Sequence, residues 1–94
     1  WLPQGGESED CLNLNVFTPR NTAQKKPVLV FIHGGMFSKG ASAMPLYDPH
    51  RLVSMNGEVV VVTLNYRLGL FGFLGGPQWR GLEGNGNWAL YDMR

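Results

Sequence analysis

The feature that most constrains the fold is an unbroken apolar segment at residues 28–32, followed directly by His33, Gly34 and Gly35. Such a run, ending at glycines, is typical of a strand buried on both faces, as in a parallel sheet. Ligands of α/β folds bind at the carboxyl ends of these strands. Glycines there let the backbone approach a ligand and leave N–H groups without partners. The segment therefore predicts a site that donates hydrogen bonds to negative charge.

A second buried strand is expected at residues 59–64, which are rich in β-branched side chains. The span between the two strands is long enough for a crossover. It contains Asp48 and Pro49, which indicate a helix over residues 49–55, with Asp48 as N-cap and Asn56-Gly57 as its end. Parallel strands joined in this way form right-handed crossovers. The middle of the chain is therefore predicted to be a βαβ unit.

The flanking segments extend this unit. Residues 12–17 alternate apolar and polar side chains, which is typical of a half-buried strand near a sheet edge, and Pro19 ends it. Residues 65–86 combine glycines with aromatic side chains and are expected to form an irregular segment packed under the fold. Asn87 is a plausible N-cap for a helix that continues to the end of the chain. The predicted fold class is α/β: a βαβ unit with a preceding edge strand.

Composition limits the classes of function. The 94 residues are 44% hydrophobic with a net charge of +1, and the charges are scattered, which argues against binding to nucleic acid or to an anionic membrane. No apolar run approaches the roughly 18 residues of a membrane span. The sequence has neither an initiating Met nor a signal segment. Residues 1–94 are therefore expected to be a fragment of a single larger domain.

Four blocks of sequence carry a more specific pattern. They are E-D-C-L-N-L-N-V-F-T-P at residues 9–19, H-G-G-M-F at 33–37, V-V-V-V-T-L-N-Y-R-L-G-L-F-G-F-L at 59–74 and G-N-W-A-L-Y-D at 86–92. In their order and approximate spacing they resemble the type B carboxylesterases and cholinesterases. The resemblance implies an α/β-hydrolase fold with a mostly parallel sheet, residence in the secretory pathway, and serine ester hydrolysis without a cofactor. It also implies that the chain is part of the N-terminal third of its domain.

The chemistry of ester hydrolysis agrees with the hydrogen-bond-donating site predicted after residues 28–32. Attack on an ester carbonyl places negative charge on its oxygen, and prearranged N–H donors stabilise that charge. The resemblance implies that the backbone N–H groups of Gly35 and Met36 are two such donors, and that Gly34 shapes the loop. A third donor and the catalytic serine, acid and histidine would lie outside residues 1–94. Taken alone, Gly34-Gly35 is better explained as an ordinary tight turn after a strand, and it is the other three blocks that favour the donor loop.

Met36 departs from the family pattern, which usually has Gly or Ala at this position. Its N–H remains, but its side chain crowds the acyl pocket and forbids most positive φ values. This would narrow the range of substrates or mark a member that has lost activity. The neighbouring Phe37 is expected to line the substrate pocket.

Other residues are assigned structural roles. His33 lacks acidic or metal-ligand partners at suitable spacing, so we expect its ring to hydrogen-bond the backbone, and no metal site is predicted. Cys11 is a small buried hydrophobe, or, by the resemblance, half of a disulfide with a cysteine upstream. The resemblance also implies a buried ion pair between Arg67 and Asp92; the alternative is that both are solvated. Ser8 and Ser42 are loop serines, because neither follows a buried strand.

Two functional hypotheses of different class remain. The first is a serine esterase that acts on small carboxylic esters and needs the rest of its catalytic domain. The second is a cholinesterase-like adhesion protein without a working triad, which Met36 slightly favours. A weaker third possibility is an isolated βαβ unit without a function of its own. The residues after Arg94 would discriminate, since they would show whether the catalytic serine is present.

Overall fold

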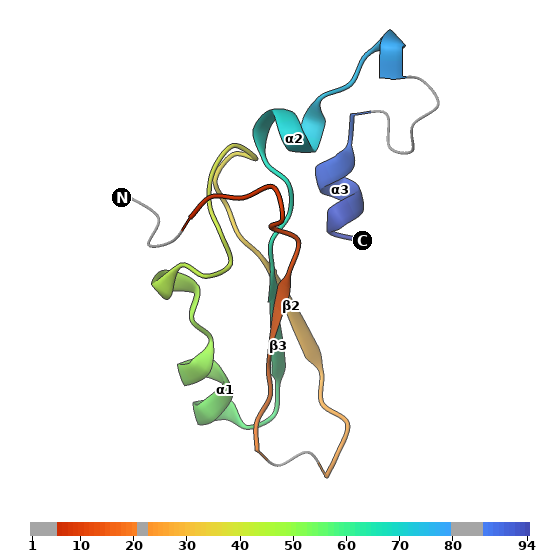
Figure 1. Cartoon of the computed structure of the whole chain (residues 1–94). Coiled ribbons are helices and arrows are strands. Elements are labelled where there is room, and N and C mark those ends of the chain that lie inside the picture. The colour runs from red at the N-terminus through yellow and green to blue at the C-terminus, as the bar shows by residue number, and fades with distance from the viewer. Residues whose placement is uncertain (1–5, 21–22, 80–85) are drawn as a thin grey trace.

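The computed structural model describes residues 6–20, 23–79 and 86–94 of the chain. In this part of the chain a three-stranded sheet lies at the centre, with its strands in the order β1-β3-β2 (Figure 1). The strands are β1 (Leu14–Phe17), β2 (Val28–Ile32) and β3 (Val60–Leu64). The helices are α1 (His50–Asn56), α2 (Gly69–Phe73) and α3 (Trp88–Asp92), with single 3₁₀ turns at Pro45–Tyr47 and Pro77–Trp79.

The pairing of the strands confirms the predicted α/β architecture. Strands β2 and β3 are parallel, in a register from Val28 opposite Val60 to Ile32 opposite Leu64, and α1 lies in the connection between them. Strand β1 pairs antiparallel with the other side of β3, so it occupies an edge as expected. The sheet is therefore a βαβ unit with an added antiparallel strand.

The prediction that residues 28–32 are buried on both faces is wrong for this chain. The central position belongs to β3, which buries Val61 and Thr63, whereas β2 lies at the opposite edge from β1. Four of the five β2 side chains are exposed, with Val28 at 60% and Ile32 at 45%. Helix α1 lies beside the sheet and buries only Val53 among its described side chains (Figure 1). The described residues therefore leave most of the apolar side chains of β2 uncovered.

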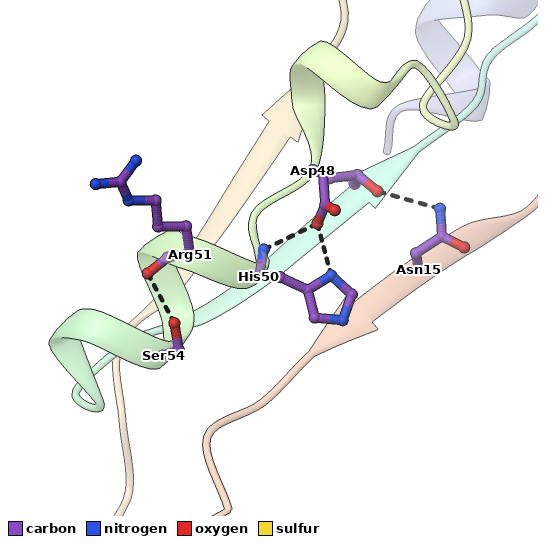
Figure 2. Close-up of polar contacts among 6 residues, drawn as sticks. Asn15, Asp48, His50, Arg51 and Ser54 are labelled. Atoms are coloured by element: carbon purple, nitrogen blue, oxygen red, sulfur yellow. Dashed lines mark hydrogen bonds and ion pairs between the residues drawn. The ribbon is translucent and has the colours of Figure 1, made fainter.

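Helix α1 begins one residue later than predicted. Pro49 takes the N-cap position, and the carboxylate of Asp48 accepts hydrogen bonds from the His50 amide at 2.9 Å and from His50 Nδ1 at 2.6 Å (Figure 2). Ser54 donates to the carbonyl of Arg51 within the helix (Figure 2). The helix also ends one residue later than predicted, at Asn56, and Gly57 closes it as expected: it adopts φ +61° and its amide donates to the Val53 carbonyl.

The segment after β3 is more regular and less buried than predicted. Residues 69–73 form α2, whose Leu70 and Phe71 are mostly exposed, so the idea of an irregular segment packed under the fold is wrong for this part. Within α2 only Gly72 is buried, because it lies against α3. Helix α3 starts after Asn87 as predicted but ends at Asp92. Residues 80–85 of the predicted segment lie outside the described residues.

Candidate functional site

The loop that follows β2 has a backbone that only glycine permits at two points. Gly35 has φ +137°, and a Cβ built on it would lie 1.7 Å from the Lys39 carbonyl oxygen. Gly40 has φ +118°, and its Cβ would lie 2.6 Å from His33 Nδ1. In contrast, a Cβ on Gly34 would meet nothing within 4 Å. The loop therefore requires glycine at positions 35 and 40 for close packing, whereas position 34 has room for a side chain.

Three successive carbonyl groups of this loop are held by hydrogen bonds from the chain itself. The His33 carbonyl accepts from the Tyr66 hydroxyl at 2.7 Å, and the Gly34 carbonyl lies 3.0 Å from His33 Nδ1. Because a carbonyl can only accept, this ring nitrogen carries the proton. The Gly35 carbonyl accepts from the amides of Ser38 and Lys39, at 3.1 and 3.2 Å, and from the Ser38 hydroxyl at 3.1 Å.

These bonds set the direction of the following amides. In a trans peptide the N–H of one residue points opposite to the carbonyl of the residue before it, and the described residues contain no cis peptide bond. The N–H groups of Gly34, Gly35 and Met36 therefore point away from the groups that hold the three carbonyls. No described residue accepts a hydrogen bond from any of the three. The loop therefore carries three backbone amides without an acceptor among the described residues, at the carboxyl end of a parallel strand.

His33 is buried at the base of the loop. Its ring is only 2% exposed and stacks on Tyr66, with ring centroids 4.5 Å apart and an interplanar angle of 18°. Burial raises the pKa of the Tyr66 hydroxyl, and the nearby Tyr47 adds to this shift, so the hydroxyl remains a donor. No group of three or more His, Cys, Asp or Glu side chains suited to a metal ion occurs among the described residues. His33 therefore contacts backbone and Tyr66 rather than any acidic partner.

Met36 and Phe37 both adopt left-handed backbone angles, with φ +55° and +58°. Positive φ was expected to be largely closed to Met36, but these values fall in the small left-handed region open to residues with a side chain. The Met36 side chain is 82% exposed and crowds none of the described residues. The Phe37 ring packs edge-on against Tyr66 and Phe73, and its carbonyl accepts from the Gly69 amide at 2.7 Å.

A groove lies beside the loop. Its lining includes Gly34, Gly35 and Gly40 of the loop, residues 6–9 of the N-terminal segment and residues 65–71 after β3. The loop and the segment after β3 leave the sheet at the same end, as parallel strands require, and α2 and α3 lie together there (Figure 1). Phe37 is not among the residues that line this groove. A pocket-lining role for Phe37 would therefore require a pocket on another side of the loop.

Arg67 and Asp92 meet in a two-pronged ion pair. Arg67 Nε and one terminal guanidinium nitrogen donate to the two carboxylate oxygens at 2.9 and 2.7 Å, and the Arg67 backbone amide adds a third bond at 2.9 Å. These bonds from Arg67 lower the pKa of Asp92, whose side chain is 4% exposed. The guanidinium also lies 5.7 Å from the centre of the Trp88 ring. The pair joins the segment directly after β3 to α3.

A polar cluster that the sequence did not indicate anchors the far end of the loop. Asn65 accepts from the Ser42 amide at 2.7 Å and donates twice to Asn13, while Asn15 donates to the Ser42 hydroxyl at 3.3 Å. Ser42 is buried, whereas Ser8 is exposed and accepts from the Asp10 amide. The available signal was an Asn directly after a buried strand, because an amide side chain that becomes partly buried there requires partners.

Cys11 is half-buried with a free thiol, and it is the one cysteine of the sequence. Within the described ranges, no helix is long and apolar enough to cross a membrane.

Comparison with known proteins gives consistent matches. The model of the carboxylesterase family matches residues 2–94. Para-nitrobenzyl esterase of Bacillus subtilis is 59% identical over 68 residues, which are 72% of this chain and 14% of that protein. Acetylcholinesterase of Bungarus fasciatus is 45% identical over 94 residues, which cover this whole chain and 15% of that protein. The solved structure of a thermophilic PNB esterase superposes with a TM-score of 0.82 at 49% identity, over 93% of this chain and 18% of that one. The chain therefore spans less than a fifth of the length of these relatives.

Proposed function

The chain belongs to the carboxylesterase family, and on that premise we propose that residues 1–94 form part of a serine hydrolase of carboxylic esters. The proposed contribution of these residues is the oxyanion loop, with the backbone N–H groups of Gly35 and Met36 as two donors. The catalytic serine, acid and histidine are proposed to lie in the remainder of the protein, together with a third donor. A small carboxylic ester is the proposed substrate, and this chemistry needs no cofactor.

One observation carries this proposal. The carbonyls of Gly34 and Gly35 are tied to His33, Ser38 and Lys39, so the next two amides face outward without a partner among the described residues. When a serine oxygen attacks an ester carbonyl, the π electrons move onto the carbonyl oxygen. Donors at about 2.7–3.1 Å from that oxygen stabilise it, and they need no reorganisation if they are already oriented. The bonds that hold the Gly34 and Gly35 carbonyls support the proposal that the loop amides are prearranged in this way.

Two further roles belong to the proposal. Phe37 is half exposed next to the two donor amides and is proposed to contact the acyl group of the substrate. Two relatives are named acetylcholinesterase and para-nitrobenzyl esterase, after small esters. We therefore propose that the substrate of this protein is an ester of similar size to acetylcholine or a p-nitrobenzyl ester. Residence in the secretory pathway and a disulfide from Cys11 to a cysteine outside this chain are proposed on the same family basis.

The second candidate is a catalytically inactive adhesion protein of the same family. The observation that favours it is the 82% exposed side chain of Met36, which stands at the donor loop where a small residue would leave more room for substrate. The backbone of Met36 still presents its N–H, so the esterase remains the better supported of the two functions.

The test is ester hydrolysis by the complete protein, measured with p-nitrophenyl acetate and butyrate. We expect saturation kinetics, and we expect Gly35→Ala to lower kcat by about 10²–10³ with a much smaller change in KM, because the added Cβ would displace the loop that carries the donors. Gly34→Ala is the matched variant, since its Cβ meets nothing within 4 Å, and it should lose clearly less activity.

Two results would contradict the proposal. A complete protein that shows no saturable hydrolysis of either ester would favour the adhesion alternative. Equal losses in Gly34→Ala and Gly35→Ala, at unchanged thermal stability, would mean that the orientation of the loop amides does not govern the reaction.

A further inference from the structure

We propose that Tyr66 is a positioning residue of the donor loop, which holds His33 and thereby fixes the directions of the Gly34 and Gly35 amides. This inference rests on the proposed esterase function and adds to it a residue that acts through the backbone. Tyr66 follows a different strand, β3, and lies 33 positions further along the sequence than His33. Its two contacts with His33 act on two successive peptide units.

The first contact is the hydrogen bond of the Tyr66 hydroxyl to the His33 carbonyl. Its length is 2.7 Å, and Tyr66 as a whole is only 3% exposed. In the trans peptide between His33 and Gly34, fixing the carbonyl also fixes the N–H of Gly34 in the opposite direction. Since water has little access, loss of the hydroxyl would leave this carbonyl without a partner and free the peptide to rotate.

The second contact is the stacking of the two rings. The Tyr66 and His33 rings lie 4.5 Å apart and nearly parallel, which holds the imidazole in the plane from which Nδ1 reaches the Gly34 carbonyl. Gly40 lies close to the Nδ1 edge of the ring, since even one added carbon there would lie 2.6 Å from both Nδ1 and the Gly34 oxygen. Stacking on Tyr66 and the close approach of Gly40 both restrict the imidazole, and its bond to the Gly34 carbonyl orients the Gly35 amide as a result.

The topology explains why Tyr66 is available for this role. His33 is the first residue after β2 and Tyr66 the second after β3, and these parallel neighbours end at the same edge of the sheet. The hydroxyl points to the backbone of the loop, so it is engaged before any ligand enters the groove. Burial also raises its pKa, which keeps the proton on the donor in neutral and mildly alkaline solution.

The experiment uses the complete protein with Tyr66→Phe, which keeps the stacked ring and removes only the hydroxyl. We expect kcat for p-nitrophenyl butyrate to fall about tenfold with KM nearly unchanged, since the donors are loosened rather than removed. The inhibition constant of an aryl trifluoromethyl ketone, which forms a tetrahedral adduct, should rise by a similar factor. Tyr91→Phe is the control, because this tyrosine is half exposed on α3 and its hydroxyl has no partner among the described residues; it should behave as wild type.

A second variant separates positioning from a general loss of structure. 4-Aminophenylalanine at position 66 retains an N–H that can donate to the His33 carbonyl, and it should recover most of the lost kcat. This prediction holds even if Tyr66→Phe fails to fold, because the donor-bearing variant should then both fold and hydrolyse the ester.

The outcomes distinguish the two proposals. If the wild-type protein shows no hydrolysis, the proposed function fails and this inference fails with it. If the wild-type protein is active, the inference alone is overturned by a Tyr66→Phe variant with wild-type kcat and ketone affinity. It is equally overturned by a 4-aminophenylalanine variant that is no more active than Phe.

Discussion

At the scale of single residues, the direction of a peptide group matters more in this chain than the chemistry of its side chains. Three neighbouring carbonyls each have a defined partner, and the amides that follow them are oriented as a consequence. The Met36 side chain plays no part in this arrangement, and its φ of +55° lies in a region where residues other than glycine are uncommon.

The ion pair between Arg67 and Asp92 leads to a prediction at the same scale. Hydrogen bonds from the Arg67 side chain, and then from its backbone amide, lower the pKa of Asp92 in the folded protein. A carboxyl group with a lowered folded pKa contributes stability above its unfolded pKa of about 3.9 and loses it as the pH falls through the folded value. We expect Asp92→Asn to lower the free energy of unfolding by about 2 kcal/mol at pH 7, less than for a fully buried pair because the Arg67 side chain is 34% exposed.

Urea denaturation of the wild-type protein and of Asp92→Asn, at pH values between 7 and 3, would measure the difference in their free energies of unfolding. The difference between wild type and Asp92→Asn should shrink as the pH falls below about 4. Asp48→Asn is the matched control: the pKa of Asp48 is also lowered, through its bonds to His50, but its side chain is 55% exposed, so its substitution should have the smaller effect. A constant difference across the whole pH range would show that the charge of Asp92 is not responsible.

At the scale of elements, α2 and α3 depend on one close approach. Gly72 of α2 lies so near the Arg67 backbone that an added Cβ would be 2.3 Å from the Arg67 carbonyl oxygen and 3.0 Å from the Ala89 methyl group. The two helices have only five residues each, so neither has enough turns to be stable alone. Their contact, the Arg67–Asp92 pair and the bond from Trp88 Nε1 to the Leu74 carbonyl hold them together.

Because of this contact, we expect Gly72→Ala to change the free energy of unfolding in the direction opposite to that given by helix propensity. Alanine normally stabilises a helix over glycine by about 1 kcal/mol. Gly72→Ala should instead lower the free energy of unfolding by about 1–3 kcal/mol, because the methyl group meets a backbone carbonyl that cannot move without shifting the end of β3.

The control for this prediction lies on the same helix. Leu70 is 73% exposed, so Leu70→Ala should change the free energy of unfolding by less than about 0.5 kcal/mol. Thermal or urea unfolding of both variants would settle the comparison. A Gly72→Ala variant as stable as wild type would show that α2 can separate from α3 without cost.

At the scale of the whole molecule, the 94 residues do not form a compact domain. Their Cα radius of gyration is 16.0 Å, against about 12 Å for a compact domain of this length. Both edge strands expose apolar side chains, among them Leu14 and Val16 of β1 and Val28 and Val30 of β2. The relatives compared here are all at least five times longer than this chain. These facts support the proposal that further parts of the protein cover the sheet.

This proposal predicts the behaviour of the 94-residue polypeptide on its own. Its unpaired strand edges and exposed apolar side chains should cause it to bind a hydrophobic dye such as ANS and to self-associate. It should also lack saturable hydrolysis of p-nitrophenyl esters, since the proposed nucleophile lies elsewhere. Dye fluorescence, size-exclusion chromatography and the ester assay would test this. A monodisperse monomer that ignores the dye and hydrolyses the ester would disprove it.

The sequence alone determined the strands, their parallel pairing, the family and the glycine loop after Ile32. These follow from local signals: apolar runs, β-branched residues, glycines and four motifs whose spacing is preserved. It failed where the outcome depended on what surrounds a segment, as with the exposure of β2 and the helical form of residues 69–73. Only the tertiary structure brought Tyr66 to His33 and Asn65 to Ser42, because these contacts join residues 33 and 23 positions apart. Such pairs depend on how neighbouring strands pack together, and a local sequence pattern does not predict that packing.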